Sequence, residues 1–144
     1  MALHLLKMCV GVETIQQLRD WQERRGVMTE AGYPVVTHFT RNRPKRDQEL
    51  LDGGSLYWII KGSIIVRNRI VGLEKVEKEG ARKKCAIVLR AEPVETIPQR
   101  HRPIQGWRYF TSDRAPADLG SRALDKTLKV PESMAAELRS LGLI

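Results

Sequence analysis

The chain has 144 residues, of which 42% are hydrophobic, so it can form one domain with a single core and is not an intrinsically disordered chain. No apolar run approaches the roughly 20 residues that a membrane-spanning helix needs. The formal net charge of +8 is compatible with a polyanionic partner and equally with a merely basic surface. The excess is concentrated, because residues 37–108 hold 16 Lys or Arg and 8 Asp or Glu.

The N-terminal segment, residues 2–10, is apolar at both odd and even positions, which predicts a central strand covered on both faces. Lys7 interrupts this run and no small-residue cleavage site follows, so we expect a cytoplasmic protein without a signal peptide. A helix is predicted next, because Thr14 and Gln17 form a capping-box pattern. Trp21 is expected to anchor that helix in the core.

The central part of the chain alternates between strand patterns and turn residues. A short helix is predicted to begin near Pro44 and to end at a pair of glycines, with Leu50 and Leu51 facing inward. Gly72 lies inside the longest strand pattern and predicts a bulge. Strands are predicted at residues 33–40, 55–61, 64–76, 83–90 and 107–110.

Three prolines interrupt residues 91–106, which therefore predict an extended, exposed segment. Further along, Pro131 begins a stripe of apolar residues at helical spacing. We expect one domain over residues 1–144, in which a helical segment at about 113–144 packs on a β core. The order of elements predicts an α+β fold with a strongly bent, mostly antiparallel sheet.

The cysteines and histidines do not form a metal-binding pattern. Cys9 and Cys85 lie in apolar strand patterns and are expected to be reduced, buried thiols. His4 is expected to be buried in the first strand, and His101, between two arginines, is expected at the surface. No zinc-ligand spacing, P-loop or nucleophile elbow is present, so the sequence predicts no metal and no cofactor.

Three residues are candidates for acid–base chemistry. His38 lies beside a basic segment, where it either contacts a phosphate, transfers a proton or has only a structural role. Asp52, at the mouth of a strand, is a candidate catalytic acid or acceptor for a base edge, and the alternative is a turn-forming residue. Lys61 ends the next strand and is the third candidate.

The run TRNRPKRD carries the main binding signal, because it places four cations at a strand-to-helix junction. Cations at a helix N-terminus oppose the helix dipole unless an anion relieves them. We therefore expect this run to bind phosphates, the alternative being a solvated charge run. The four cations are Arg41, Arg43, Lys45 and Arg46.

The stretch LYWIIK raises the question of which aromatic side chain faces solvent. Tyr57 and Trp58 must point to opposite faces of a strand, because successive strand residues alternate. Trp58 shares its face with apolar neighbours and is expected in the core. Tyr57 shares its face with Lys61 and is expected to be the solvent-exposed ring of a base pocket.

Two other predicted strands carry arginines that are candidates for binding nucleic acid. Trp107 and Arg108 suit stacking on a base and contact with a phosphate, the alternative being that Trp107 pins the last strand to the core. Arg67 and Arg69 lie on one face of a strand and either contact phosphates or border the core.

Three motifs closely resemble one uncharacterised alphaproteobacterial family, catalogued as domain of unknown function 1489. They are LHLLKMCVG, LLDGGSLYWIIKG and PIQGWRYF, and the resemblance covers nearly the whole chain. Because the family has no established activity, the resemblance assigns no catalytic residue.

A second resemblance covers about a quarter of the chain, from Arg43 to Val76. DGGSLYW and IVGLEKV resemble the turn, aromatic strand and later strand of PUA-like domains, especially the EVE and ASCH branches. The resemblance implies a small β-barrel with flanking helices that binds RNA or a modified base in a basic and aromatic cleft. Some ASCH members hydrolyse modified nucleosides, so it leaves an enzymatic activity open.

These observations predict a nucleic-acid-binding module, with RNA as the expected polymer. The alternatives are a hydrolase that acts on a nucleotide or modified nucleoside, and a protein-interaction domain for an acidic partner. The oligomeric state is left open. The predicted binding residues are Arg41, Arg43, Lys45, Arg46, Tyr57, Lys61, Arg67, Arg69, Trp107 and Arg108.

Overall fold

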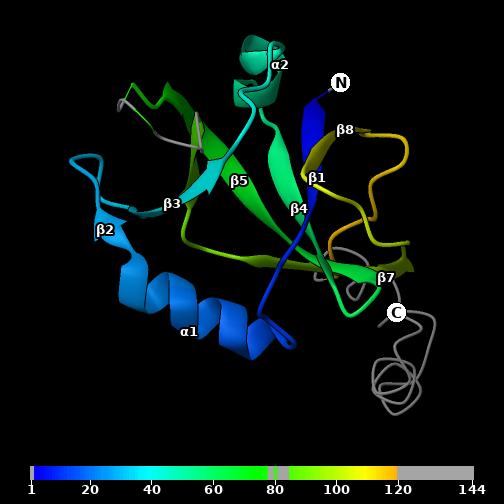
Figure 1. Ribbon diagram of the computed structural model, residues 1–144. Coiled ribbons are helices and arrows are strands. Elements are labelled where there is room, and N and C mark those ends of the chain that lie inside the picture. The colour runs from blue at the N-terminus through cyan, green and yellow to red at the C-terminus, as the bar shows by residue number, and fades with distance from the viewer. Residues whose placement is uncertain (1, 78–79, 81–84, 120–144) are drawn as a thin grey trace.

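A computed structural model describes residues 2–77, 80 and 85–119, which form a strand-rich α+β fold (Figure 1). The helix predicted near Pro131 lies outside the described residues. The two helices of the described part are α1 (Ile15–Arg25) and α2 (Asp47–Leu51). Its strands are β1 (Leu3–Met8), β2 (Val27–Met28), β3 (Pro34–Thr40), β4 (Ser55–Ile60), β5 (Ser63–Lys75), β6 (Cys85–Arg90), β7 (Val94–Arg100) and β8 (Trp107–Thr111).

Helix α1 begins where the capping pattern predicts. The Thr14 hydroxyl accepts a hydrogen bond from the Gln17 amide at 3.1 Å, and the Gln17 side chain accepts one from the Glu13 amide at 2.7 Å. Leu18 and Gln22 are buried against the sheet, whereas Trp21 packs on the core and stays half-buried. Figure 1 shows α2 at the start of β4 and α1 towards its other end.

The strands pair in the order β2-β3-β6-β5-β4-β1-β8, and β7 pairs with β5. Strands β1 and β4 are parallel and every other described pair is antiparallel, which confirms a mostly antiparallel sheet. The ladder between β5 and β6 shifts register between Ile70 and Gly72, so the predicted bulge is confirmed. Ser63–Arg69 of β5 pairs with β4, and Ile70–Lys75 pairs with β6, so the bulge lies where β5 changes partner.

The sheet does not close into a barrel, because β2 and β8 are not paired with each other within the described residues. Side chains connect its margins instead. The Trp107 indole N–H donates to the Asn42 carbonyl at 2.9 Å. The Tyr109 hydroxyl accepts from the backbone amides of Lys45 and Arg46 at 3.0 and 3.2 Å. Strand β8 is thereby tied to the chain that leaves β3.

Both faces of β4 are buried. Leu56, Trp58 and Ile60 belong to the main core cluster, so the prediction for Trp58 is confirmed. Tyr57 belongs to a second cluster on the other face, packs edge-to-face on Phe110 at 5.4 Å between ring centroids, and is only 5% exposed. The prediction that Tyr57 faces solvent is therefore wrong, because the chain after β7 covers its face.

The segment after β6 is also less exposed than predicted. Residues 94–100 form strand β7, and Ile104 is buried in the second cluster beside Phe110. The β5–β7 ladder shifts register between Ile64 and Val66. Pro98 lies in the part of β7 opposite this shift, where its missing amide interrupts no regular ladder. The prolines therefore led to the prediction of an exposed segment where the structure has a strand.

Candidate functional site

A cleft of about 1020 Å³ opens on the main-core side of the sheet. Its walls come from the end of β1 and the following turn, from α1, from the end of β3 and from the loop before β8. All three tryptophans of the chain line it: Trp21 of α1, Trp58 of β4 and Trp107 of β8. We call this hollow the tryptophan cleft.

The charged side chains that line the tryptophan cleft are all cationic. Lys7, Arg24 and Arg41 line it, and among the residues that the structure describes no Asp or Glu does so. The side-chain amides of Asn42 and Gln105 add hydrogen-bonding groups. A recessed site with charges of one sign focuses the electric field, so it attracts anions.

A buried polar network holds the base of the cleft. The Trp58 indole N–H donates to the Asn68 side-chain oxygen at 2.9 Å, and Asn68 and Gln22 exchange two amide hydrogen bonds of 2.9 Å each. Asn68 also donates to the Arg90 carbonyl at 2.8 Å. His38 packs edge-to-face on Trp58, at 5.1 Å between centroids. The network joins α1 to the sheet and fixes the indole, because each of these amides is fully buried.

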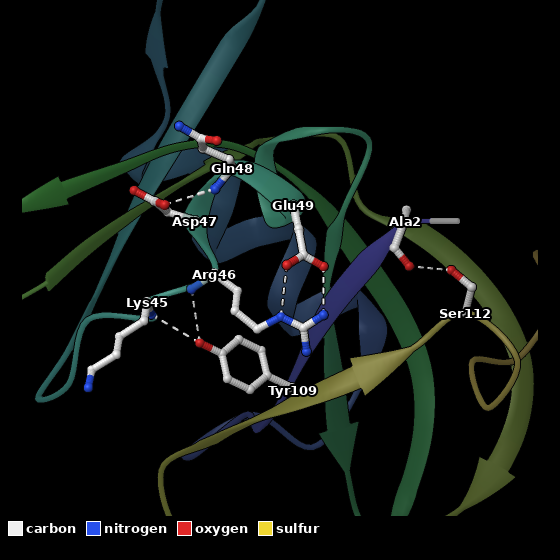
Figure 2. A network of polar contacts seen from close by, with 8 residues as sticks. All are labelled: Ala2, Lys45, Arg46, Asp47, Gln48, Glu49, Tyr109 and Ser112. Atoms are coloured by element: carbon white, nitrogen blue, oxygen red, sulfur yellow. Dashed lines mark hydrogen bonds and ion pairs between the residues drawn. The ribbon is translucent and has the colours of Figure 1, made fainter.

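The rim of the cleft continues into residues 41–46, which we call the basic loop. Trp107 holds the start of this loop through the Asn42 carbonyl. Tyr109 holds its end through two backbone amides (Figure 2). Trp107 and Tyr109 also pack on each other edge-to-face, at 5.0 Å between centroids. The basic loop is therefore attached to β8 at two points.

The cations of the basic loop do not oppose a helix dipole as predicted, because α2 has only five residues and carries acids in its first turn. The Arg43 guanidinium lies 2.8 Å from the Asp47 carboxylate. Arg46 bonds both oxygens of Glu49, at 2.9 and 2.6 Å (Figure 2). These hydrogen bonds hold the pKa values of Asp47 and Glu49 below their usual range.

Helix α2 pairs two of the four cations of the basic loop and buries one of its two leucines. Arg41 and Lys45 form no ion pair within the described part of the chain, so they are the uncompensated cations of the basic loop. Leu51 is 40% exposed, against the prediction, because one helical turn can bury only Leu50.

The other predicted cations lie away from the tryptophan cleft. Lys61 lies in the tight β4–β5 turn, 3.7 Å from the Glu13 carboxylate. Arg67 binds both oxygens of Asp118 at 2.8 Å and lowers the pKa of that carboxyl. The exposed side chains of Arg69 and Arg108 belong to the face of Tyr57, since their cross-strand partners are Ser55 and Leu6. Of the ten predicted binding residues, the cleft contains Arg41 and Trp107.

The three candidates for acid–base chemistry do not come together. His38 lines the cleft, whereas Asp52 ends α2 and Lys61 lies in the β4–β5 turn. Cys9 also lines the cleft as a free thiol, and burial raises its pKa to about 11, so it is protonated at neutral pH. The described residues contain no group of three or more side chains that could hold a metal ion.

Sequence reasoning missed part of the site. The sequence predicts Trp21 and Trp58 as core residues, and the structure shows that they also form the wall of the cleft. Lys7 interrupts an apolar run, and a cation at such a position is the sequence signal that points to the site. Arg24 lies in the last turn of α1, where a cation also suits the helix dipole, so its position gives no separate signal of a site.

The family model described as "Protein of unknown function (DUF1489)" matches residues 5–144 of the chain. The chain belongs to the DUF1489 family. No curated protein and no solved structure matches it significantly, so membership of DUF1489 supplies no activity and the comparisons lend no support to the PUA-like resemblance. Within the described residues of this DUF1489 chain, neither helix is long and apolar enough to cross a membrane.

Proposed function

We propose that this DUF1489 protein binds nucleic acid, with RNA as the preferred polymer, and that the tryptophan cleft receives a base. The observation that carries the proposal is the composition of the cleft wall, where the described residues contribute three indole rings, three cations and no carboxylate. Each feature has an ordinary structural explanation by itself. Their coincidence in one hollow is what favours a ligand that is both aromatic and anionic.

The chemistry of a nucleotide fits this wall. Stacking of a base on an aromatic side chain contributes about 1–3 kcal/mol, and cations nearby neutralise its phosphate. A cleft of about 1020 Å³ is at the upper end of the roughly 300–1,000 Å³ of typical ligand sites, so a nucleotide can enter it. The amides of Asn42 and Gln105 offer donors and acceptors to a base edge.

The alternatives have less support. A hydrolase needs a second acid–base group beside His38, and neither Asp52 nor Lys61 lines the cleft. A docking site for an acidic protein would use exposed apolar residues such as Val10 and Phe39, and both belong to the cleft lining itself.

Binding can be measured through intrinsic fluorescence, because every tryptophan of the chain lines the cleft. We expect an RNA of about ten nucleotides to quench this fluorescence at about 50 mM salt and to bind more weakly at about 200 mM salt. Arg41→Glu should weaken binding at least about tenfold, since it replaces attraction by repulsion at the rim. Arg69→Glu makes the same charge change on the opposite face and should have little effect.

Two results would contradict binding of RNA in the tryptophan cleft. The first is no binding of RNA to the wild-type protein at the lower salt concentration. The second is an equal loss of affinity in Arg41→Glu and Arg69→Glu, because it would place the contact outside the cleft. A DNA strand of the same sequence that binds more tightly than RNA would contradict the preference for RNA.

A further inference from the structure

The tryptophan cleft and the basic loop form one continuous surface. Arg41 and Asn42 line the cleft and are also the first two residues of the loop. The Asn42 carbonyl accepts hydrogen bonds from the Trp107 indole at 2.9 Å and from the Thr40 hydroxyl at 3.0 Å, so the junction is held from both sides. A ligand that fills the cleft and extends past Arg41 therefore meets the basic loop next.

The far end of the basic loop is also fixed before any ligand binds. The Tyr109 hydroxyl accepts from two consecutive amides, those of Lys45 and Arg46, and the Arg46 guanidinium lies 5.5 Å from the centroid of the Tyr109 ring (Figure 2). A loop held in this way loses little conformational freedom on binding, so its contacts contribute more fully to affinity.

The charges of the basic loop divide into two kinds. Arg43 and Arg46 are compensated by Asp47 and Glu49 of α2. Arg41 is at the cleft, Lys45 lies four residues further on, and neither is in an ion pair with any described residue. In Figure 2 the Lys45 side chain points away from the Arg46–Glu49 pair. The loop thus presents one cation at the cleft and a second one outside it.

The aromatic rings of the cleft are recessed. Trp58 is 2% exposed, and Trp21 and Trp107 are half-buried. In a duplex each base is stacked and paired, and taking it out costs a few kcal/mol. Only an unpaired base reaches these rings without that cost.

We infer that the tryptophan cleft and the basic loop together bind a single strand: one unpaired base enters the cleft while a neighbouring phosphate lies against Lys45. This inference rests on the proposed function, and it adds the strandedness of the ligand and the path of its backbone. The cleft supplies stacking, and Arg41 and Lys45 supply two successive phosphate contacts.

The test compares Lys45→Ala with Lys75→Ala, an equal loss of charge at the exposed end of β5. The probe is a single-stranded RNA of about ten nucleotides, measured by tryptophan quenching over a series of salt concentrations. Lys45→Ala should lower the affinity about three- to tenfold at low salt and reduce the slope of log K against log salt by about 0.7, the value for one phosphate contact of a single strand. Lys75→Ala should keep the wild-type affinity and slope. The same RNA annealed to its complement should bind the wild-type protein at least about tenfold more weakly.

Either of two outcomes overturns the inference while the binding of nucleic acid itself stands. One is a wild-type salt slope in Lys45→Ala, which would show that the strand does not run over the basic loop. The other is equal affinity for the duplex and the single strand, which would show that no unpaired base enters the cleft. Failure of the wild-type protein to bind the single strand at low salt would overturn the proposed function itself. Circular dichroism of Lys45→Ala checks folding, which should be unchanged because Lys45 uses its backbone amide, not its side chain, to bond Tyr109.

Discussion

At the residue scale, the hydrogen bonds of the buried His4 side chain require its ring to be neutral. Its Nδ1 accepts a hydrogen bond from the Ser55 amide at 2.9 Å, so the neutral ring carries its proton on Nε2 and donates to the Ser112 hydroxyl at 3.1 Å. Ser112 in turn donates to the Ala2 carbonyl at 2.5 Å (Figure 2). Burial, and after it the positive charge of Arg67, lower the pKa of His4. Protonation would place an N–H against the Ser55 amide and break this chain.

This arrangement predicts an acid-sensitive stability. Because the pKa of His4 is lowered in the folded protein, the unfolded chain takes up a proton first as the pH falls. The stabilisation from neutral His4 is complete above about pH 6.5 and is lost progressively below it, toward the lowered pKa of the folded state. Urea unfolding at a series of pH values between about 7 and about 5 should show a shallower pH dependence in His4→Gln than in the wild-type protein.

His101→Gln is the matched control, because His101 follows β7 and its ring contacts, among the described residues, the neighbouring Arg102 carbonyl alone, so the same substitution is made outside the His4 network. The comparison concerns slopes, since His4→Gln also lowers the absolute free energy of unfolding by removing hydrogen bonds. Equal slopes for His4→Gln and the wild-type protein would contradict the assignment.

At the scale of elements, the turn between α2 and β4 is tightly packed around Gly54. Of the described glycines, Gly54 is the one at which an added Cβ atom would come closest to its neighbours. The Gly54 amide donates to the Leu50 carbonyl at 2.9 Å, and the Gly54 carbonyl accepts from the Ile70 amide at 3.0 Å. A Cβ atom at residue 54 would collide with the backbone oxygens of Leu3 and Leu50. The pair of glycines therefore does more than end a helix: it lets α2 and β4 approach β1.

We expect Gly54→Ala to lower the free energy of unfolding by about 3 kcal/mol, because backbone atoms cannot move aside as a side chain can. Gly72→Ala is the control, since among the described residues its Cβ would meet only the Val88 side chain, at 3.3 Å. That variant should lose at most about 1 kcal/mol in the same urea titration. A Gly54→Ala protein as stable as Gly72→Ala would show that α2 and β4 can separate freely.

At the scale of the whole molecule, the two margins of the bent sheet meet without strand pairing. The basic loop leaves β3 and is bonded to Trp107 and Tyr109 of β8, far away in the sequence. The tryptophan cleft lies beside this contact, with Trp107 in its wall and Trp58 at its base. The shape of the cleft therefore depends on a few hydrogen bonds that join distant segments.

Tyr109→Phe tests this connection by removing one oxygen. The amides of Lys45 and Arg46 would lose their acceptor, so their hydrogen exchange should become faster while the free energy of unfolding falls by about 1 kcal/mol. Tyr33→Phe is the control, because the Tyr33 hydroxyl makes no hydrogen bond to the described residues. If exchange at residues 45 and 46 is unchanged in Tyr109→Phe, something other than Tyr109 positions the basic loop.

Much of the fold could be predicted from local patterns, because a helix cap, a strand period and a bulge each depend on neighbouring residues. The Thr14 cap, the Gly72 bulge and the inward face of Trp58 are examples. Strand β7 escaped prediction because Pro98 is tolerated only at an irregular pairing, and that irregularity is a property of two strands together.

The candidate site was predictable only in part for the same physical reason. The sequence by itself determined a basic middle region, the face of Trp58 and the aromatic character of β8. Only the tertiary structure decided that Tyr57 is covered by the chain after β7, and that Trp21 and Trp58 join Trp107 around one hollow. Alternation along a strand fixes which face a side chain occupies, but what covers that face depends on segments about 50 residues away or more, such as Phe110 opposite Tyr57.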